Sequence, residues 1–331
     1  IPPVSIRDMV IHPRERDLIL GTHGRGVMII DDLTPLRALN EDIIQKELAF
    51  LPSKPYVITP TIRSQNFPGD DEFSGTNPNS NAVVTYYLKK RHIFGDLFLE
   101  VYDKEGNLIK KVPSGKRKGI NRVYWNTRKK PPRIPRGKGL AFQAAFGPSL
   151  APGNYTVKLT KGEEVYETEV ELVFDPRSPH SKSDLQANFE ATTRSYELLE
   201  ELAETVAHIQ ALEEQAGERI EKLKTSKFKE SISSFKDDLN MLRKTLVATR
   251  SGGITGEVRL REKLSEVYGG ISGYSGKPTQ SQVDALEDIA VEIKAAITAF
   301  GSQLEKLPKI NKGLKKRKLD ELTYVPEKEE E

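Results

Sequence analysis

The first fifty residues alternate short aliphatic runs with polar turns. The runs cover residues 5–11, 18–22 and 27–31, and HPRERD and HGRG separate them. Aliphatic and β-branched runs of this length between turn residues predict the three strands of an antiparallel meander. Gly24 and Gly26 suit the positive φ values that a tight second turn often needs. Because three strands cannot bury both faces of a sheet, we expect this region to pair with β structure from another part of the protein or from another chain.

The middle of the chain reads as a separate β domain over residues 81–178. Residues 51–80 are rich in Pro, Asn, Ser and Gly, and this composition predicts a linker. Five later runs have the length and alternation of strands, at residues 82–88, 95–103, 121–126, 153–160 and 165–175. Trp125 is the only tryptophan, and we expect it in the core between two sheets.

The pattern changes from period two to heptads at Ser183, close to a domain boundary at Asp175-Pro176. The clearest stripe has apolar residues spaced four and three apart, at 228, 232, 235, 239, 242 and 246. Two further stripes follow, and the last runs from Val283 to Leu307. Thr279 and Gln282 form a predicted capping box at its start. The pattern predicts three or four antiparallel helices over residues 183–322, followed by a charged tail at 323–331 that frays.

Three regions of the chain carry a resemblance to a known family, and they occur in that family's order. The segment SIRDMVIHPRERDLILGTHGRGVMIIDDLTPL resembles the last blade of the neuraminidase-repeat, sortilin-like β-propellers of large exported bacterial proteins. The segments INRVYWN, APGNYTVKLT and VELVFDPR resemble the immunoglobulin-like domain that follows that propeller and also occurs in the flagellar hook-capping protein. The KPTQSQ start of the last long helix resembles the family's carboxy-terminal region.

The resemblance implies a multidomain chain of β and α structure. It gives an incomplete β-propeller blade at 1–50, a linker at 51–80, an Ig-like β-sandwich at 81–178 and an antiparallel helical bundle at 183–322. It also implies a protein exported to the periplasm or the cell surface of a bacterium. The chain starts at Ile1 without a basic or apolar leader, so we expect any export signal to precede it.

Two functions are compatible with this resemblance. The first is a non-catalytic accessory or scaffold role, in which the chain mediates contacts with other proteins or with the cell envelope. The second is a structural appendage of a sialidase-like or other hydrolase whose active site lies in the missing part of the propeller. Family members are often labelled glycosyl hydrolases, yet a glycosidase needs two carboxyls facing one cleft, and no such pair is recognisable.

Composition excludes several kinds of chemistry. The chain has no cysteine, which removes disulfides, thiolate metal sites and cysteine nucleophiles. Its five histidines are dispersed, and HExxH, GxSxG, P-loop and dinucleotide-binding patterns are missing. We therefore predict no catalytic residue, no metal site and no cofactor for this chain. No apolar run approaches the length of a transmembrane helix.

Charge is distributed unevenly although the net charge is only +3. Residues 110–138, here called the basic run, hold twelve Lys or Arg and no Asp or Glu. One interpretation is a solvated loop and edge strand. A second is docking to an acidic envelope protein, glycan or lipid. A third is an internal contact with the acidic stretch 190–221, which has nine Glu against two Arg. Nucleic acid is disfavoured because no aromatic stacking platform accompanies the charge.

Two groups of candidate binding residues follow. His23 and Arg25 lie in the GTHGRG turn, where they are either parts of a structural turn or a polar pair on a propeller face. The other candidates are the densest parts of the basic run, namely Lys116, Arg117, Lys118, Arg128, Lys129 and Lys130.

Overall fold

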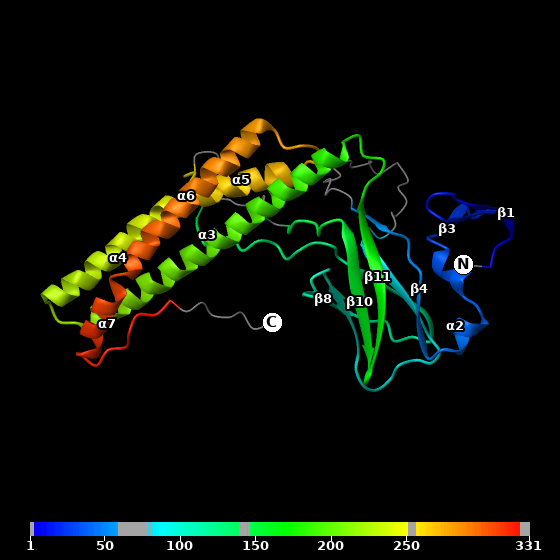
Figure 1. Ribbon diagram of the computed structural model, residues 1–331, viewed down its shortest axis with the longest axis horizontal. Coiled ribbons are helices and arrows are strands. Elements are labelled where there is room, and N and C mark those ends of the chain that lie inside the picture. Colours follow the sequence, from blue (N-terminus) through cyan, green and yellow to red (C-terminus); the bar gives the residue numbers. More distant parts are fainter. Residues whose placement is uncertain are drawn as a thin grey trace. The chain divides into compact units, whose positions relative to one another are not determined.

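The computed structural model describes residues 3–58, 79, 81–138, 144, 146–250 and 256–324. It contains both sheets and helices, as the sequence predicts (Figure 1). The chain divides into two compact units. The first holds the described residues up to 127 together with 150–178, and the second holds 128–149 and everything from 179 onward.

The first unit begins with a small three-stranded sheet. Its strands are β1 (Ile6–Ile11), β2 (Leu18–Thr22) and β3 (Val27–Ile30), joined in that order as an antiparallel meander. The predicted meander is therefore confirmed. Gly24 and Gly26 have φ values of 79° and 68°, and the β2–β3 turn needs glycine there for conformation. Two short helices follow, α1 (Thr34–Ala38) and α2 (Glu41–Gln45).

Eight strands form the rest of the first unit. One sheet has the order β5-β11-β10-β7-β8, and the other has the order β4-β6-β9. The bounds are β4 Leu48–Leu51, β5 Tyr56–Ile58, β6 Ala82–Leu88, β7 Leu97–Tyr102, β8 Leu108–Pro113, β9 Gly119–Trp125, β10 Gly153–Lys161 and β11 Glu164–Phe174. All five strands predicted in this region are present.

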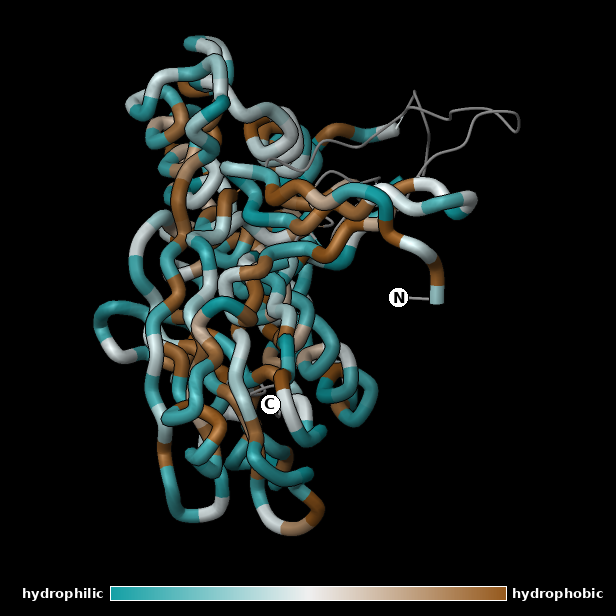
Figure 2. The backbone as a smooth tube through the Cα atoms, turned by 90° about the vertical axis from the view of Figure 1, so that its right-hand side faces the viewer, coloured by the Kyte–Doolittle hydropathy of each residue, from teal (hydrophilic) through white to brown (hydrophobic). Residues whose placement is uncertain are grey.

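Alternation along these strands builds one apolar core. Residues 97–102 of β7, for example, alternate between buried and half-buried positions. Figure 2 shows how hydrophobic and hydrophilic residues are mixed along the backbone. Side chains from both sheets meet in this core. Trp125 is 1% exposed and lies beside Tyr155, with ring centroids 6.2 Å apart. The prediction of Trp125 as a core residue is confirmed.

The sequence missed three strands, and two of them bear on the predicted boundary at residue 50. Residues 56–58 were assigned to a linker but form β5, which pairs in parallel with the end of β11. β4 straddles the predicted boundary at residue 50. The missed β8 lies at the start of the basic run. The remainder of the predicted linker, residues 59–78 and 80, lies outside the described residues.

The second unit contains the long helices. They are α3 (Lys182–Lys222), α4 (Lys227–Leu246), α5 (Leu260–Ser272), α6 (Gln280–Leu304) and α7 (Leu307–Lys315). Their apolar stripes share one core. The capping box of Thr279 and Gln282 is confirmed, and Ser181 with Asp184 forms a second one at the start of α3. Among the described residues, no helix has both the length and the apolar character needed to cross a membrane.

The end of the chain differs from the prediction in two ways. The last heptad stripe does not form one helix, because α6 ends at Leu304 and α7 starts at Leu307, with Pro308 in its first turn. The predicted fraying tail starts at 323, yet Thr323 exchanges hydrogen bonds of 2.7 and 2.9 Å with Gln215. Tyr324 packs edge-on against His208. Residues 325–331 lie outside the described residues.

Candidate functional site

His23 and Arg25 lie in the exposed turn between β2 and β3. Hydrogen bonds to backbone carbonyls fix this turn, because the His23 N–H donates to the Ser5 carbonyl at 2.9 Å and the Thr22 hydroxyl donates to the Gly26 carbonyl at 2.6 Å. Among the described residues, neither the His23 nor the Arg25 side chain takes part in a hydrogen bond or ion pair. The turn presents two solvated polar side chains and holds no group arranged for catalysis.

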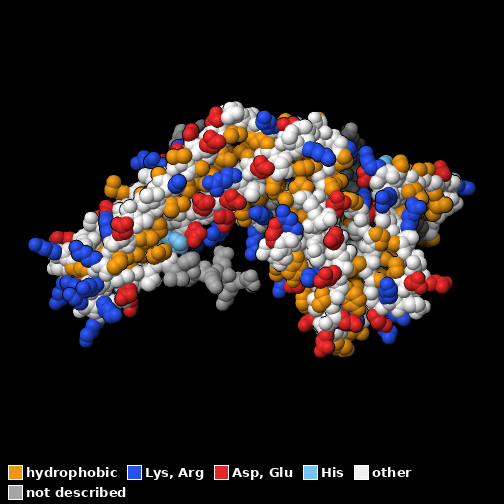
Figure 3. Space-filling view, in the orientation of Figure 1, with side chains coloured by type: hydrophobic (Ala, Val, Ile, Leu, Met, Phe, Trp, Pro, Cys, Tyr) orange, Lys and Arg blue, Asp and Glu red, His pale blue; other side chains and the backbone are white. Residues whose placement is uncertain are grey.

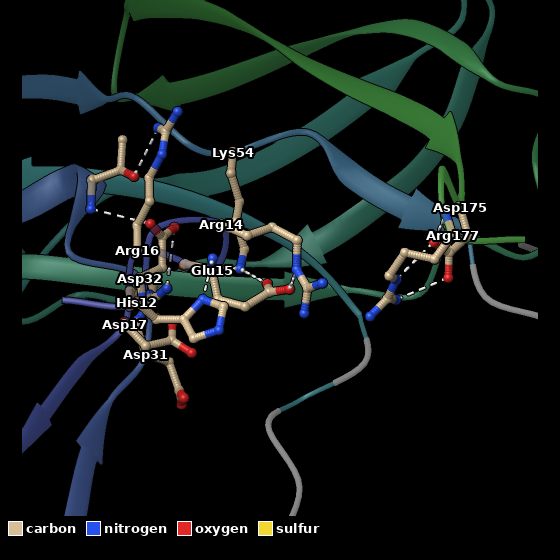
Figure 4. Close-up of polar contacts among 12 residues, drawn as sticks. His12, Arg14, Glu15, Arg16, Asp17, Asp31, Asp32, Lys54, Asp175 and Arg177 are labelled. Atoms are coloured by element: carbon tan, nitrogen blue, oxygen red, sulfur yellow. Dashed lines mark hydrogen bonds and ion pairs between the residues drawn. The ribbon is translucent and has the colours of Figure 1, made fainter. Parts of the chain in front are cut away.

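The small sheet is fixed to the rest of the first unit through ion pairs (Figure 4). The Glu15 carboxylate lies between two cations, 2.8 Å from Arg14 Nε and 2.9 Å from Lys54 Nζ. Its hydrogen bonds to Lys54 and Arg14 lower the pKa of Glu15 from 4.5 to about 2. Lys54 lies between β4 and β5, so this pair links the β1–β2 turn to the two larger sheets.

A second anchor surrounds Asp32, whose side chain is 3% exposed. The Asp32 N–H donates to the Asp17 carboxylate at 2.8 Å, and one Asp32 oxygen accepts from the Thr34 N–H at 3.1 Å. The other oxygen has no hydrogen bond and lies 3.8 Å from the guanidinium of Arg122 on β9. Arg122 also donates to the Asp31 carbonyl at 2.9 Å. In the described part of the chain, no three acidic or histidine side chains are placed to hold a metal ion.

The structure divides the basic run between the two units. Lys110, Lys111, Lys116, Arg117, Lys118 and Arg122 belong to the β unit, and Arg128, Lys129, Lys130, Arg133, Arg136 and Lys138 belong to the helical unit. Lys116, Arg117 and Lys118 are exposed in the connection between β8 and β9. The run is therefore divided between two units, and residues 128–149, which the sequence analysis assigned to a β domain over 81–178, group with the helical unit.

The second half of the basic run belongs to a longer segment, which we call the strap. The strap comprises residues 128–138, 144 and 146–149. Its two ends run antiparallel, with an isolated bridge between Arg128 and Ser149, and the Lys129 N–H donates to the Pro148 carbonyl at 2.9 Å. The Arg128 guanidinium donates to the Gly147 carbonyl at 3.0 Å. The Lys129 ammonium lies over the ring of Tyr196 on α3, 5.3 Å from its centroid. Lys130 is exposed.

The strap packs along the helices of its own unit. Glu200 of α3 accepts from the Arg133 backbone N–H at 2.5 Å and from its guanidinium at 2.6 Å. The internal contact between the basic run and the acidic stretch is thus confirmed for Arg133. Further along, the Lys138 N–H donates to the Ala248 carbonyl at 3.0 Å, and the Tyr268 hydroxyl donates to Phe146.

A buried ion pair on α5 contacts the strap. Arg261 and Glu262 on α5 have side chains only 4% and 8% exposed, and their charged groups lie 2.5 Å apart. Arg261 also donates to the Pro135 carbonyl at 2.9 Å. Ala144 of the strap is fully buried in the helical core. These contacts assign the second half of the basic run mainly to folding.

A different basic surface lies at the end of the helical unit, and the sequence analysis missed it. Residues 222–229 and 306–318, here called the basic tip, hold ten Lys and one Arg with no Asp or Glu. The two segments meet, because Arg317 stacks over Phe228 at 4.1 Å and one surface depression is lined by Lys222, Lys224 and Arg317. Figure 3 shows blue side chains gathered at this end. Seven basic residues within 306–318 were a visible signal, but the partner segment is brought to them only by folding.

Comparisons with known proteins add no constraint on these sites. No protein-family model, no curated protein and no solved structure significantly matches the chain.

Proposed function

We propose that this chain is a non-catalytic scaffold part of an exported bacterial propeller protein, which mediates contacts with other proteins or with the cell envelope. In this proposal the small sheet is the last blade of a β-propeller. The two larger sheets are an Ig-like sandwich, and the helical unit is an antiparallel bundle. The proposal rests on the resemblance of three regions of the chain and on the exposed apolar surface of the small sheet.

The exposure of the small sheet is the observation that carries the proposal. All six residues of β1 are exposed, and Met9 and Val27 are 64% and 67% exposed. The strand register places Val10 and Ile29 on either side of Ile19, on one face of the sheet. Both flanking side chains are more than half exposed. In the described part of the chain no further strand pairs with the outer edge of β1 or β3.

Such a sheet is incomplete as an isolated structure. Exposed, unpaired edges template pairing with other strands, and contiguous exposed apolar surface marks an interaction site. A β-rich partner would pair with an edge and cover these side chains at once. Arg122, Asp32, Lys54 and Glu15 hold the sheet in place for such a partner without covering its apolar faces.

Photo-crosslinking in the producing cell tests this proposal. A photoreactive residue replacing Val10 should give a defined adduct with β structure, either of a partner or of the same polypeptide. The matched control is Phe94, which is 87% exposed in the loop between β6 and β7 and should give only diffuse background. Equal labelling at the two positions would show that the small sheet has no partner and would refute the scaffold proposal.

A further inference from the structure

Several lysines of the basic tip lie at the amino-terminal ends of helices, where positive charge is unfavourable for folding. Lys227 and Lys229 lie in the first turn of α4, and Lys306 and Lys309 lie at the cap and first turn of α7. The amino-terminal end of a helix carries partial positive charge, so a cation there is unfavourable. Lys222, Lys312 and Lys315 lie instead in last turns, where the helix dipole favours them.

Only part of this charge is satisfied within the protein. Lys306 pairs with Asp238 at 2.8 Å, Lys229 donates to the Leu223 carbonyl at 3.0 Å, and Arg317 donates to the Gly313 carbonyl at 3.0 Å. The other eight basic side chains of the tip are exposed and belong to no ion pair within the described residues. Their mutual repulsion and the helix-end cost of Lys227 and Lys309 are not compensated inside the unit.

The chemistry of the tip fits a broad anionic surface better than a shaped ligand. Ten of its eleven cations are lysines, which act as hydrated point charges, whereas bidentate recognition of single phosphates favours arginine. Polymer-binding grooves combine basic tracks with stacking aromatics. The one aromatic residue in the two segments is Phe228, and Arg317 covers it.

The tip also contains no large exposed hydrophobic side chain. Its charges lie on a protruding end of the helical unit (Figure 3), where several of them can meet one plane together. The depression beside Lys222, Lys224, Ser226 and Arg317 has a volume of about 320 Å³ and is large enough for a phosphate group. This combination describes electrostatic adsorption without insertion of apolar side chains.

We propose that the basic tip docks the helical unit onto the surface of an anionic phospholipid bilayer. Each lysine near such a surface contributes to attraction, and the attraction decays within a Debye length. This docking does not depend on pairing of the small sheet, which lies in the other unit. The two proposals therefore fail separately.

Vesicle co-sedimentation of the full chain tests the proposal at low ionic strength. The chain should sediment with phosphatidylcholine vesicles containing about one third phosphatidylglycerol and not with phosphatidylcholine alone. Replacing Lys227→Gln together with Lys309→Gln should weaken partitioning about 10- to 30-fold. The same pair should leave the melting temperature unchanged or raise it, since both lysines oppose a helix dipole. A merely structural role would predict the opposite change in stability.

Two further variants make the outcome decisive. Lys316→Gln with Lys318→Gln removes two tip charges beyond the end of α7 and should weaken partitioning to a similar degree. Lys116→Gln with Lys118→Gln removes the same charge from the β unit and should change partitioning less than about twofold. Equal loss in this control, or binding to neutral vesicles, would overturn the proposal. Retention on heparin without vesicle binding would replace the bilayer by a polymeric anion.

Discussion

The strap and the small sheet are both short segments attached to a larger core, but different interactions attach them. Buried contacts hold the strap, whereas partly exposed ion pairs hold the small sheet. The strap buries Ala144 completely and is held by Arg261 and Tyr268, both nearly inaccessible to solvent. The small sheet buries Leu20 in its strands and is otherwise held by partly exposed ion pairs. Its remaining apolar area is still exposed to water, at a cost of about 25 cal/mol per Å². The strap is complete within this chain, whereas the sheet has surface left for a partner.

The largest effect is expected at the support of the strap. Arg261→Ala removes one partner of a buried ion pair and leaves the buried Glu262 carboxylate without its guanidinium partner, which should cost about 3–5 kcal/mol of unfolding free energy. Urea unfolding followed by far-UV circular dichroism measures this loss. Arg194→Ala is the matched control, because Arg194 pairs with Glu197 and Glu201 at the surface and its loss should cost less than about 1 kcal/mol. Equal costs would show that the strap does not depend on its buried anchor.

The second effect tests how closely the ends of the strap approach each other. A Cβ at Gly147 would collide with the backbone carbonyls of Lys129 and Lys130. Gly147→Ala should therefore cost about 1–3 kcal/mol through forced backbone shifts. Gly301→Ala is the control of opposite sign, since nothing lies within 4 Å of its added Cβ, and it should stabilise α6 by about 0.5–1 kcal/mol. Thermal unfolding of both variants compares the two; a neutral Gly147→Ala would contradict the close approach.

Sequence patterns predicted the elements that satisfy themselves locally and missed those that depend on tertiary contacts. Residues 82–88 are a continuous run of mainly aliphatic and aromatic residues and form β6 with the predicted bounds, and the Thr279 capping box spans only four residues. β5 is three residues long and exists because it pairs with β11, more than a hundred positions later. Its own sequence contains no alternation long enough to reveal it.

The same reason explains the outcome for the candidate sites. The basic run looked like one surface because charge was counted along the chain, and the fold separates Lys118 from Lys129 into different units. The contact of Arg133 with Glu200 was foreseeable from opposite charge. The backbone carbonyls that Arg261 and Tyr268 hold carry no sequence signal. The heptads also continue smoothly through Leu304 and Leu307, although Pro308 starts a new helix there.

A smaller effect is expected from the pairing of Glu15 with Lys54. The folded pKa of Glu15 is depressed to about 2, so its stabilisation is present above the unfolded value of 4.5 and is lost as the pH falls towards 2. Solvent screening of this partly exposed pair limits its contribution to about 0.2–1 kcal/mol. Glu15→Gln should flatten the stability profile in that pH window, while Glu105→Gln, at a pair exposed on both sides, should leave it unchanged. A Glu15 carboxyl that titrates near 4.5 by NMR would contradict the anchor.

The smallest effect is the most informative about the small sheet. Val10→Ser with Ile29→Ser replaces two apolar side chains that are 54% and 58% exposed on one face. Folding of this chain gains little from them, so chemical denaturation should show a change within about 0.5 kcal/mol. Leu20→Ala is the internal control, because Leu20 is 2% exposed and its truncation should cost about 2–5 kcal/mol. If the double variant were as damaging as Leu20→Ala, the face would already be used within the chain. If it is neutral but abolishes crosslinking from a photoreactive residue at Val27, which is two positions from Ile29 on the same face, the exposed side chains serve a partner, because the fold itself does not need them.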